Sequence, residues 1–412
     1  MELREPSARY AMAVMPAANA GQLPGDWDML PLSEVAHFLD GLRRPVKDTD
    51  RAEMQGPIPY YGASGIVDYV NDFLFDDDLI LLAEDGENIL SRNSRIAFRV
   101  RGKSWVNNHA HVLKARTGIS TGWLCEVLES LDYGQYNSGT AQPKLNKQTC
   151  LRIEIAVPPS GVEQEAIAAA LGDADALIES LEQLLAKKRQ LKQGAMQELL
   201  TGKRRLPGFS DGWEIVRLGQ IGQPFGGLTG KSKKDFGHGS ARYITFMNVI
   251  KNVVIDGGMH ECVDVAGSEA QNRVARGDLL FNGSSETPEE VGLCALLNAE
   301  VNDLYLNSFC FGFRLRADIA ASGLYLAYFF RSHAGRDLMR SLAQGATRYN
   351  LSKTALLRLQ FQAPAAAEQV AIATLLSDLD TELEAIEAQL AKARHLKQGM
   401  AQALLTGRIR LV

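Results

Sequence analysis

Residues 163–206 read EQEAIAAALGDADALIESLEQLLAKKRQLKQGAMQELLTGKRRL, and residues 368–411 read EQVAIATLLSDLDTELEAIEAQLAKARHLKQGMAQALLTGRIRL. The second stretch repeats the first at an offset of 205 positions, and roughly 25 of the 44 aligned residues are identical. Identity at this level exceeds what a shared helical composition produces. The chain of 412 residues is therefore an internal duplication, and its length suggests two to four domains.

Each copy of the repeat predicts one long helix. Apolar residues alternate at steps of four and three, which is the pattern of a coiled-coil seam. Pro158, Pro159 and Pro364 precede the helices, and Gly202 and Gly407 follow them, as expected at helix boundaries. About 40 helical residues span roughly 60 Å, which is too long for a helix inside one compact domain. We expect the two helices to pair antiparallel within the chain, with pseudo-two-fold symmetry. The predicted seam comprises Ile167, Leu171, Ala174, Ile178, Leu181, Leu185, Leu191, Ala195 and Leu199, and then Ile372, Leu376, Leu379, Leu383, Ile386, Leu390, Leu396, Met400 and Leu404.

The segments before the two helices have the usual size of a domain and differ from each other in sequence. The stretch that opens at Trp27 is echoed by the one that opens at Trp213, and both contain short apolar runs between Gly, Asn and Asp turns. The expected strands include Leu79–Ala83, Arg95–Val100, Ala241–Met247, Asp278–Phe281 and Phe309–Arg314. The predicted order is an N-terminal arm (1–22), a first globule (23–157), a first long helix (158–206), a second globule (207–362) and a second long helix (363–412). We expect an α+β fold, in which two globules of mixed strands and short helices are joined by the coiled coil.

The composition limits the class of protein. Hydrophobic residues make up 46% of the chain and charged residues 23%, which is typical of a chain that folds around a core. Five scattered cysteines form no Cys-x-x-Cys pair, and this usage favours a reducing compartment without a structural zinc site. No apolar stretch approaches the ~20 residues of a membrane span, so we expect a cytoplasmic protein. The net charge of −5 predicts weak binding of nucleic acid by this chain alone, because phosphate contacts need basic residues.

Several motifs occur in a fixed order along the chain. They are Pro59-Tyr60-Tyr61-Gly62-Ala63-Ser64-Gly65-Ile66, Arg276-Gly277-Asp278-Leu279-Leu280-Phe281, the turns GTAQ at 139–142 and GATR at 345–348, and the opening Glu-Gln-x-x-Ile-Ala of both helices. Together with two similar helices and two divergent globules, these motifs resemble the specificity subunit of a type I restriction–modification enzyme. The resemblance extends from about Trp27 to Leu411.

This resemblance implies that the chain is one subunit of a larger enzyme, in which different subunits have different tasks. Each globule would be a target recognition domain that reads one half of a bipartite double-stranded DNA sequence. The paired helices would set the distance between the half-sites and dock two methyltransferase subunits, which methylate adenine. A translocating restriction nuclease subunit would complete the assembly. S-adenosylmethionine would bind to the methyltransferase, and ATP and Mg to the nuclease, so we expect no cofactor, no metal and no catalytic residue on this chain.

The residues expected to contact DNA are polar side chains at turns and strand ends, because bases are read by hydrogen bonds in the grooves. In the first globule they are Tyr60, Tyr61, Ser64, Arg101, Lys103, Asn107, Asn108, His109, Ser138, Thr140, Gln142 and Lys144. In the second they are Lys231, Lys233, Lys234, Asn248, Asn282, Ser284, Ser285, Thr347, Arg348, Tyr349 and Asn350. For any one of these, a solvated turn is the alternative. For Asn107-Asn108-His109, the specific alternative is a turn in which the Asn side chains cap their own backbone.

Enzymatic interpretations find little support among the motifs. Residues 226–232, GGLTGKS, are one residue short of a phosphate-binding loop, and a flexible glycine loop beside lysines is the better interpretation. Asp76-Asp77-Asp78 could bind a cation, but a solvated turn before the next strand is expected instead. Methyltransferase, nucleotide and hydrolase signatures are absent from the sequence. Two alternative functions remain: a coiled-coil scaffold or adaptor without DNA binding, and an enzyme whose active site follows no motif.

Overall fold

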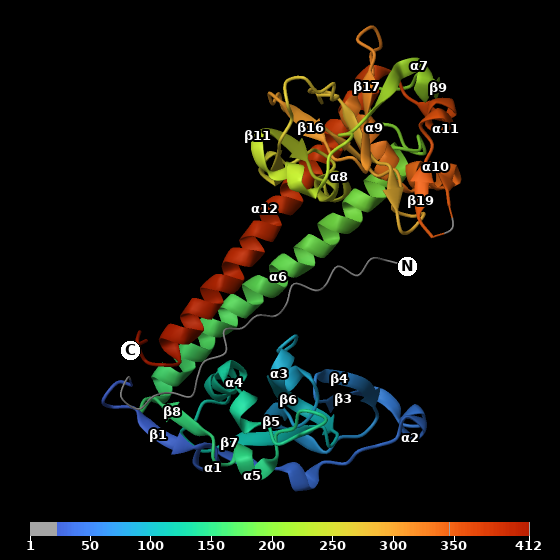
Figure 1. Cartoon of the computed structure of the whole chain (residues 1–412). Coiled ribbons are helices and arrows are strands. Elements are labelled where there is room, and N and C mark those ends of the chain that lie inside the picture. The colour runs from blue at the N-terminus through green and yellow to red at the C-terminus, as the bar shows by residue number, and fades with distance from the viewer. Residues whose placement is uncertain (1–22, 346, 412) are drawn as a thin grey trace. The chain divides into compact units, whose positions relative to one another are not determined.

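The computed structural model describes residues 23–345 and 347–411 (Figure 1). The predicted N-terminal arm lies outside the described residues. The chain forms two compact units: unit 1 combines the residues up to Glu182 with those from Ala388 onward, and unit 2 is Gln183–Glu387. Within the described ranges, no helix is both long and apolar enough to cross a membrane.

The two units do not coincide with the five consecutive segments predicted from the sequence, because each long helix is divided between them. Ile167, near the start of the first long helix, lies in the core of unit 1, whereas Leu199, at its end, lies in the core of unit 2. The two ends of the helix therefore have different packing partners.

Unit 1 is built on a six-stranded sheet with the strand order β2-β7-β5-β6-β3-β4, in which only β3 and β6 pair in parallel. Its elements are β1 (Asp28–Pro31), α1 (Leu32–Val35), β2 (Ala36–Phe38), η2 (Asp40–Leu42), α2 (Asp48–Ala52), β3 (Gln55–Gly62), β4 (Gly65–Val70), β5 (Phe75–Ala83), α3 (Asn88–Ser91), β6 (Ala97–Val106), β7 (Ala110–Ala115), α4 (Thr121–Ser130), η3 (Gly134–Tyr136), α5 (Lys147–Cys150), β8 (Glu154–Val157) and the first part of α6 (Gly161–Leu199).

Strand β5 is buried on both faces. Ile80 and Leu82 share a core with Trp123 of α4, while Leu79 and Leu81 face a second apolar cluster. This continuous apolar run is what a central strand covered on both sides requires.

The acidic run Asp76–Asp78 belongs to β5, so the prediction of a solvated turn before the strand is wrong. Asp77 forms an ion pair with Lys114 of the neighbouring strand β7. Asp78 forms an ion pair with Arg99 of β6 on the other side. The acidic residues are therefore tied into the sheet by cross-strand pairs.

Unit 2 divides its strands among smaller sheets, with the orders β10-β17-β13-β15, β12-β11-β16, β14-β19-β18 and β20-β9. Its elements are β9 (Glu214–Arg217), α7 (Leu218–Ile221), β10 (Gly222–Gly226), η4 (Lys233–Asp235), β11 (Phe236–Ile244), α8 (Phe246–Lys251), η5 (Gly257–Met259), β12 (His260–Val263), β13 (Leu279–Asn282), β14 (Ser284–Ser285), β15 (Cys294–Leu296), β16 (Leu304–Leu306), β17 (Cys310–Leu315), α9 (Gly323–Arg331), α10 (His333–Leu342), β18 (Ala343–Gln344), β19 (Tyr349–Leu351), α11 (Lys353–Arg358), β20 (Gln360–Ala363) and the first part of α12 (Ala366–Leu404).

The helix parts run antiparallel within each unit, and ion pairs fix their register. In unit 1 the N–O distances are 2.6 Å for Lys397–Asp175, 2.6 Å for Arg394–Glu182 and 2.8 Å for Arg410–Glu163. Unit 2 repeats each pair at the offset of 205 residues, as Lys192–Asp380, Arg189–Glu387 and Arg205–Glu368. The antiparallel pairing and its pseudo-two-fold repetition, predicted from the sequence, are thereby confirmed.

The predicted seam is correct along most of each helix and wrong at the leucines of the repeated LKQG runs. Ile167, Leu171, Leu185, Ile372, Leu376, Ile386 and Leu390 are buried, and Ile178, Leu181, Leu379 and Leu383 are half-buried. Leu191 and Leu396, however, are 53% and 59% exposed. Lys192 and Lys397 take the inward positions instead, because each meets the repeated aspartate of the other helix.

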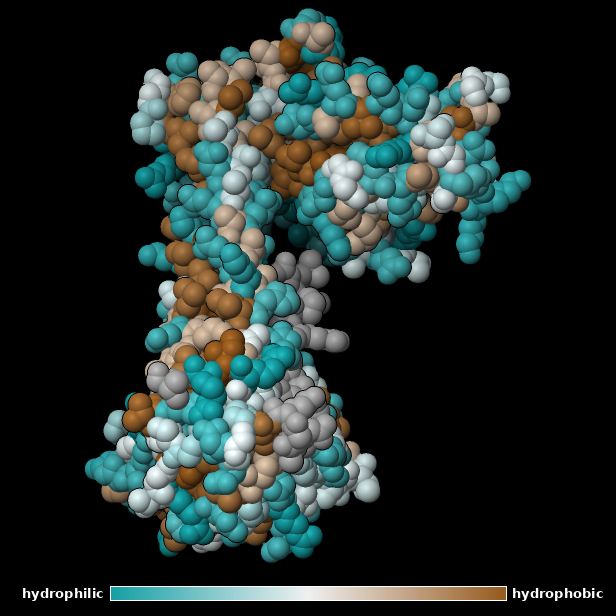
Figure 2. All heavy atoms as spheres, turned by 90° about the vertical axis from the view of Figure 1, so that its left-hand side faces the viewer, coloured by the Kyte–Doolittle hydropathy of each residue, from teal (hydrophilic) through white to brown (hydrophobic). Residues whose placement is uncertain are grey.

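The long helices also carry apolar side chains on their outer surface. Figure 2 shows hydrophobic side chains gathered there among polar ones. The exposed leucines are Leu177, Leu184, Leu191 and Leu396, and the first three are spaced seven residues apart on α6. These residues are not part of the seam between the helices, so they are available to a partner.

The glycines that end the long helices differ in how tightly they are enclosed. Gly202 and Gly407 share a left-handed φ of 69°. A Cβ atom at Gly407 would lie 2.4 Å from Cγ of Pro24, whereas one at Gly202 would lie 3.2 Å from the Trp213 ring. Both sites are helix C-caps that disfavour a side chain.

We expect Gly407→Ala to destabilise the protein by more than the ~1–2 kcal/mol that the left-handed conformation alone costs, and Gly202→Ala by about that amount. Gly194→Ala is a matched control inside α6, where no atom lies within 4 Å of the added Cβ. It should stabilise the helix by up to ~1 kcal/mol. Urea unfolding measures all three, and equal losses for Gly407→Ala and Gly202→Ala would contradict the packing argument.

Candidate nucleic-acid interface

Three segments of unit 1 meet at one edge of the sheet: the end of β5, the turn between β6 and β7, and the loop that precedes α5. Backbone hydrogen bonds join them. The amide of Glu84 donates to the carbonyl of His109 over 2.9 Å, and the amide of Leu145 donates to the carbonyl of Glu84 over 2.8 Å. The amide of Asn107 donates to the carbonyl of Tyr61 over 3.0 Å, which brings the end of β3 to the same place.

Unit 2 repeats this backbone framework. The amide of Gly283 donates to Phe309 over 2.8 Å, that of Leu351 to Gly283 over 2.9 Å, and that of Asn307 to Ile244 over 3.1 Å. These bonds establish which residues of the two units correspond. Asn107-Asn108-His109 corresponds to Asn307-Ser308-Phe309.

The same side-chain cap shapes both turns. Oδ1 of Asn107 accepts from the amide of His109 over 2.8 Å, and Oδ1 of Asn307 accepts from the amide of Phe309 over 2.9 Å. Asn107 is buried. Its capping alternative is therefore correct for the amide oxygen, although Asn107 also lines the hollow described next. Asn108 and His109, by contrast, remain exposed.

An open hollow of about 570 Å³ lies in front of the turn in unit 1. Ser64, Asp85, Asn108 and His109 are among the residues that line it. His109 Nδ1 lies 2.9 Å from Oδ2 of Asp85, and the His109 side chain is 52% exposed. An imidazole, a carboxylate, an amide and a hydroxyl therefore face one solvent-accessible space.

The corresponding hollow in unit 2 measures about 330 Å³ and has a different character. Ser284, Ser308, Phe309 and Asn350 are among its lining residues. The Arg348 guanidinium lies 5.0 Å above the Phe309 ring centroid and donates to Oγ of Ser284 over 3.3 Å. Here the turn presents an aromatic ring with a cation stacked on it.

Different buried contacts support the two turns. In unit 1 the strand that follows the turn carries His111, whose Nδ1 lies 2.8 Å from Asp40 and whose Nε2 lies 2.8 Å from the Leu145 carbonyl. Burial lowers the pKa of His111, but the interactions with Asp40 and Cys150 together outweigh this effect and raise the pKa to about 10. The ring is thus protonated at neutral pH, and both nitrogens donate. In unit 2 the corresponding Phe311 instead stacks on Phe281.

Most of the residues predicted to contact DNA have exposed side chains. The exposed residues are Ser64, Arg101, Lys103, Asn108, His109, Ser138, Thr140, Gln142, Lys144, Lys233, Lys234, Thr347, Arg348 and Asn350, while Tyr61 and Tyr349 are half-buried. Arg101 and Lys103 lie on β6, and Lys233 and Lys234 lie in η4. Of the exposed predicted contacts, only Ser64, Asn108, His109 and Asn350 line one of the two hollows.

Three predicted contacts have structural roles instead. Tyr60 is 1% exposed, and its hydroxyl accepts from the amide of Val46. Asn248 and Asn282 are fully buried and hold loops by bonding the backbone, at Asp256 and at Glu290 and Leu293. Asn248 and Asn282 use both their amide oxygen and their amide nitrogen inside the fold, so they offer nothing to a base.

Three further predicted contacts are largely buried or already bonded within the fold. Ser284 and Ser285 are buried, and Ser285 bonds Glu290. Lys231 bonds Glu269 over 2.7 Å and its side chain is 7% exposed. The glycine loop that precedes it leads into η4, a three-residue 3-10 helix, rather than into the long helix of a phosphate-binding loop.

Four residues around the two hollows, Asp85, Asn307, Ser308 and Phe309, belong to none of the motifs in the sequence. The signal available in the sequence was an Asn-x-ring pattern directly before a strand, at 107–109 and again at 307–309. Each pattern is followed by a serine that caps a buried helix, Ser120 for α4 and Ser322 for α9. The divergence of the surrounding residues hid this correspondence.

Comparison with known proteins agrees with this architecture. A family model described as type I restriction modification DNA specificity domain matches residues 24–189 and 210–393. A putative type I restriction enzyme specificity subunit of Haemophilus influenzae is 36% identical over 137 residues, which are 33% of this chain and 34% of that protein. The EcoprrI specificity subunit of Escherichia coli is 30% identical over 132 residues, 32% of this chain and 31% of that protein. The matched part thus spans about a third of the length of these curated relatives.

A solved structure extends the likeness over nearly the whole chain. The crystal structure of a type I restriction-modification system S subunit from M. genitalium covers 95% of this chain and 99% of that one, with a TM-score of 0.62 and 13% identity. At this identity the likeness shows the fold. The family model, matched once in each half of the chain, shows the relationship. The chain belongs to the family of type I restriction modification DNA specificity domains.

Proposed function

We propose that the chain is the DNA sequence-recognition subunit of a type I restriction–modification enzyme, in which each unit reads one half of a bipartite target. One observation supports this most directly. The two units hold the same turn by the same backbone bonds but present different side chains there, His109 and Phe309. Two units that recognise different DNA half-sites need the same backbone framework with different side chains at the contact positions.

The long helices would set the half-site spacing and dock the methyltransferase subunits. Their repeated ion pairs give the two ends of the helix pair equivalent chemistry, which suits two identical partners. The exposed leucines of α6 and α12 provide apolar contact area. A restriction nuclease subunit would complete the enzyme. S-adenosylmethionine, ATP and Mg would belong to the partners, and this chain would be non-catalytic.

Exchange of one globule tests this proposal. Replacing residues 23–157 by the matching segment of a related subunit with another target should change the methylated sequence in one half-site only. Replacing residues 207–362 should change the other half. The reason is that each mismatched base pair costs ~1–3 kcal/mol, so an unmatched half-site is not bound. Mapping of methylated adenines in a host that also expresses the methyltransferase subunit measures the result.

The same experiment separates the alternatives. A coiled-coil adaptor without DNA binding predicts an unchanged methylation pattern in both exchanges. An enzyme with an active site of its own predicts methylation without the methyltransferase subunit, so a strain lacking that subunit is the control. A change in both half-sites from one exchange would contradict the division of specificity between the units.

A further inference from the structure

We infer that His109 and Phe309 are equivalent specificity-determining residues: His109 recognises a base through an exposed hydrogen-bond acceptor, and Phe309 recognises a thymine through its methyl group. This inference rests on the proposed function and deepens it. The two units would then differ in sequence specificity partly because different side chains occupy one position of the backbone framework that they share.

The backbone at this position is rigid in both units. In each, the carbonyl of the residue accepts from a strand end and its amide donates to the capping asparagine two residues before it. His109 and Phe309 are therefore held in the same way at both backbone polar groups. What differs between the units is the side chain, and both side chains are about half exposed beside an open hollow.

The bond to Asp85 sets the chemistry of His109. An ionised carboxylate only accepts hydrogen bonds, so Nδ1 of His109 must carry the proton that points to Asp85. In the neutral ring, Nε2 is then left as an acceptor. No group among the described residues bonds Nε2. In the major groove, a lone acceptor matches the exocyclic amines of adenine or cytosine.

Phe309 offers no hydrogen bond. The residue is 54% exposed, so part of its apolar surface is open to a ligand. Arg348 stacks at 5.0 Å from the ring centroid and is held by Ser284. The 5-methyl group of thymine is the apolar feature that the major groove presents, and an aromatic ring beside a cation suits it.

The experiment uses the full chain, co-expressed with its methyltransferase subunit, and maps methylated adenines across the host genome. His109→Phe should alter the preference at one base pair of one half-site, and Phe309→His at one base pair of the other. Binding of the assembled enzyme to the parental duplex should weaken roughly 10- to 100-fold in each case. His37→Phe on β2 makes the same exchange as His109→Phe, and Ile215→His on β9 introduces a histidine for another apolar residue. Both positions are exposed and outside the hollows, and both variants should leave the two half-sites unchanged.

His109→Gln provides a second variant, since its amide oxygen keeps an acceptor near the hollow. It should retain more of the parental preference than His109→Phe. Unchanged half-sites in both His109→Phe and Phe309→His would overturn the inference while leaving the proposed function intact. Uniform weakening on all sequences would also overturn it, because that behaviour marks phosphate contacts. Absence of any sequence preference in the unaltered chain would instead contradict the proposed function itself.

Discussion

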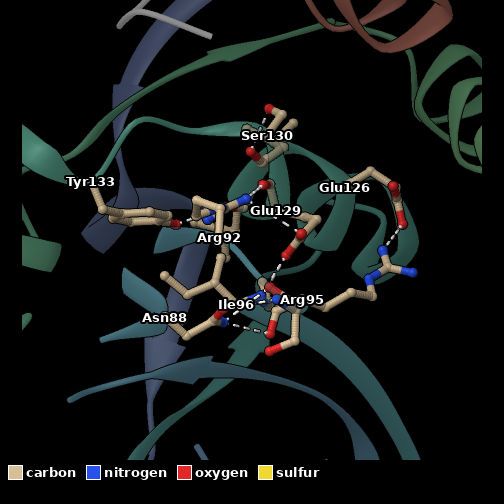
Figure 3. Close-up of polar contacts among 12 residues, drawn as sticks. Asn88, Arg92, Arg95, Ile96, Glu126, Glu129, Ser130 and Tyr133 are labelled. Carbon is tan, nitrogen blue, oxygen red and sulfur yellow. Dashed lines mark hydrogen bonds and ion pairs between the residues drawn. The ribbon is translucent and has the colours of Figure 1, made fainter. Parts of the chain in front are cut away.

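Replacing Arg92 by methionine is expected to destabilise unit 1 by about 3–5 kcal/mol at neutral pH, because it leaves a buried carboxylate without its cation. Figure 3 shows Arg92 directed at Glu129 of α4, beside the ring of Tyr133. Nη2 of Arg92 lies 3.3 Å from Oε1 of Glu129, and the Glu129 side chain is completely buried. Its Oε2 accepts from the amides of Ile96 and Ala97 over 2.8 and 2.9 Å.

The loss should depend on pH in a defined direction. Burial raises the pKa of Glu129 above the ordinary value of 4.5, and the Arg92 charge opposes that rise. Without Arg92 the folded-state pKa should rise further, whereas the unfolded-state pKa does not change. The folded variant then takes up a proton that the unfolded chain releases, so part of the lost stability should return as the pH falls from 7 toward 5.

Urea unfolding of the full chain at several pH values measures this effect. Glu129→Gln is the matched variant, since it keeps an oxygen for the two amides and removes the charge. The double variant Arg92→Met with Glu129→Gln should therefore lose less stability at pH 7 than Arg92→Met alone. Arg316→Met, which removes one partner of an exposed pair with Asp318, should change little. A loss that stays constant between pH 5 and 7 would contradict the explanation.

The second large effect concerns the two lysines that replace leucines in the helix seam. Lys397→Met should cost about 2–3 kcal/mol, whereas Lys192→Met, its repeat equivalent, should cost about 1 kcal/mol or less. The Lys397 side chain is 5% exposed and meets two carboxylates, Asp175 at 2.6 Å and Glu126 at 3.5 Å. Lys192 is more exposed and meets Asp380.

The asymmetry has a structural cause. Asp380 also accepts a 2.6 Å hydrogen bond from the Tyr328 hydroxyl, so it keeps a buried partner when Lys192 is removed. Loss of Lys397 leaves two carboxylates close together in unit 1, with Arg95 as their remaining cation. Unfolding in urea measures both variants, and Tyr328→Phe combined with Lys192→Met is the control. That combination should approach the loss seen for Lys397→Met, and equal losses for the two single variants would contradict the argument.

Long, strongly periodic features were predictable from the sequence because their determinants are local. The repeat, the two long helices and their antiparallel pairing follow from residue spacing within each copy. The seam failed at Leu191 and Leu396 for a non-local reason. A lysine displaces the expected leucine because an aspartate of the other helix lies opposite, at Asp380 or Asp175. Spacing within one helix contains no information about that partner.

The candidate site, like the helix seam, was only partly predictable from the sequence. The sequence indicated polar turns, and Asn108 and His109 do line a hollow, but Asn248 and Asn282 are used inside the fold. A polar residue type does not distinguish a base contact from a loop cap, since both need the same hydrogen-bonding groups. Burial decides between them, and burial depends on the whole tertiary arrangement.

By itself, the sequence determined the duplication, the α+β class, the helix pair and the family resemblance, because identity at a fixed offset and helical periodicity survive in the linear chain. Only the tertiary structure decided that His109 and Phe309 occupy one equivalent position. Around them the globules share too few residues to align, and the correspondence resides in backbone hydrogen bonds between segments distant in the chain. Backbone bonding is common to all residue types, so it is conserved where side chains diverge, and it becomes visible only in the fold.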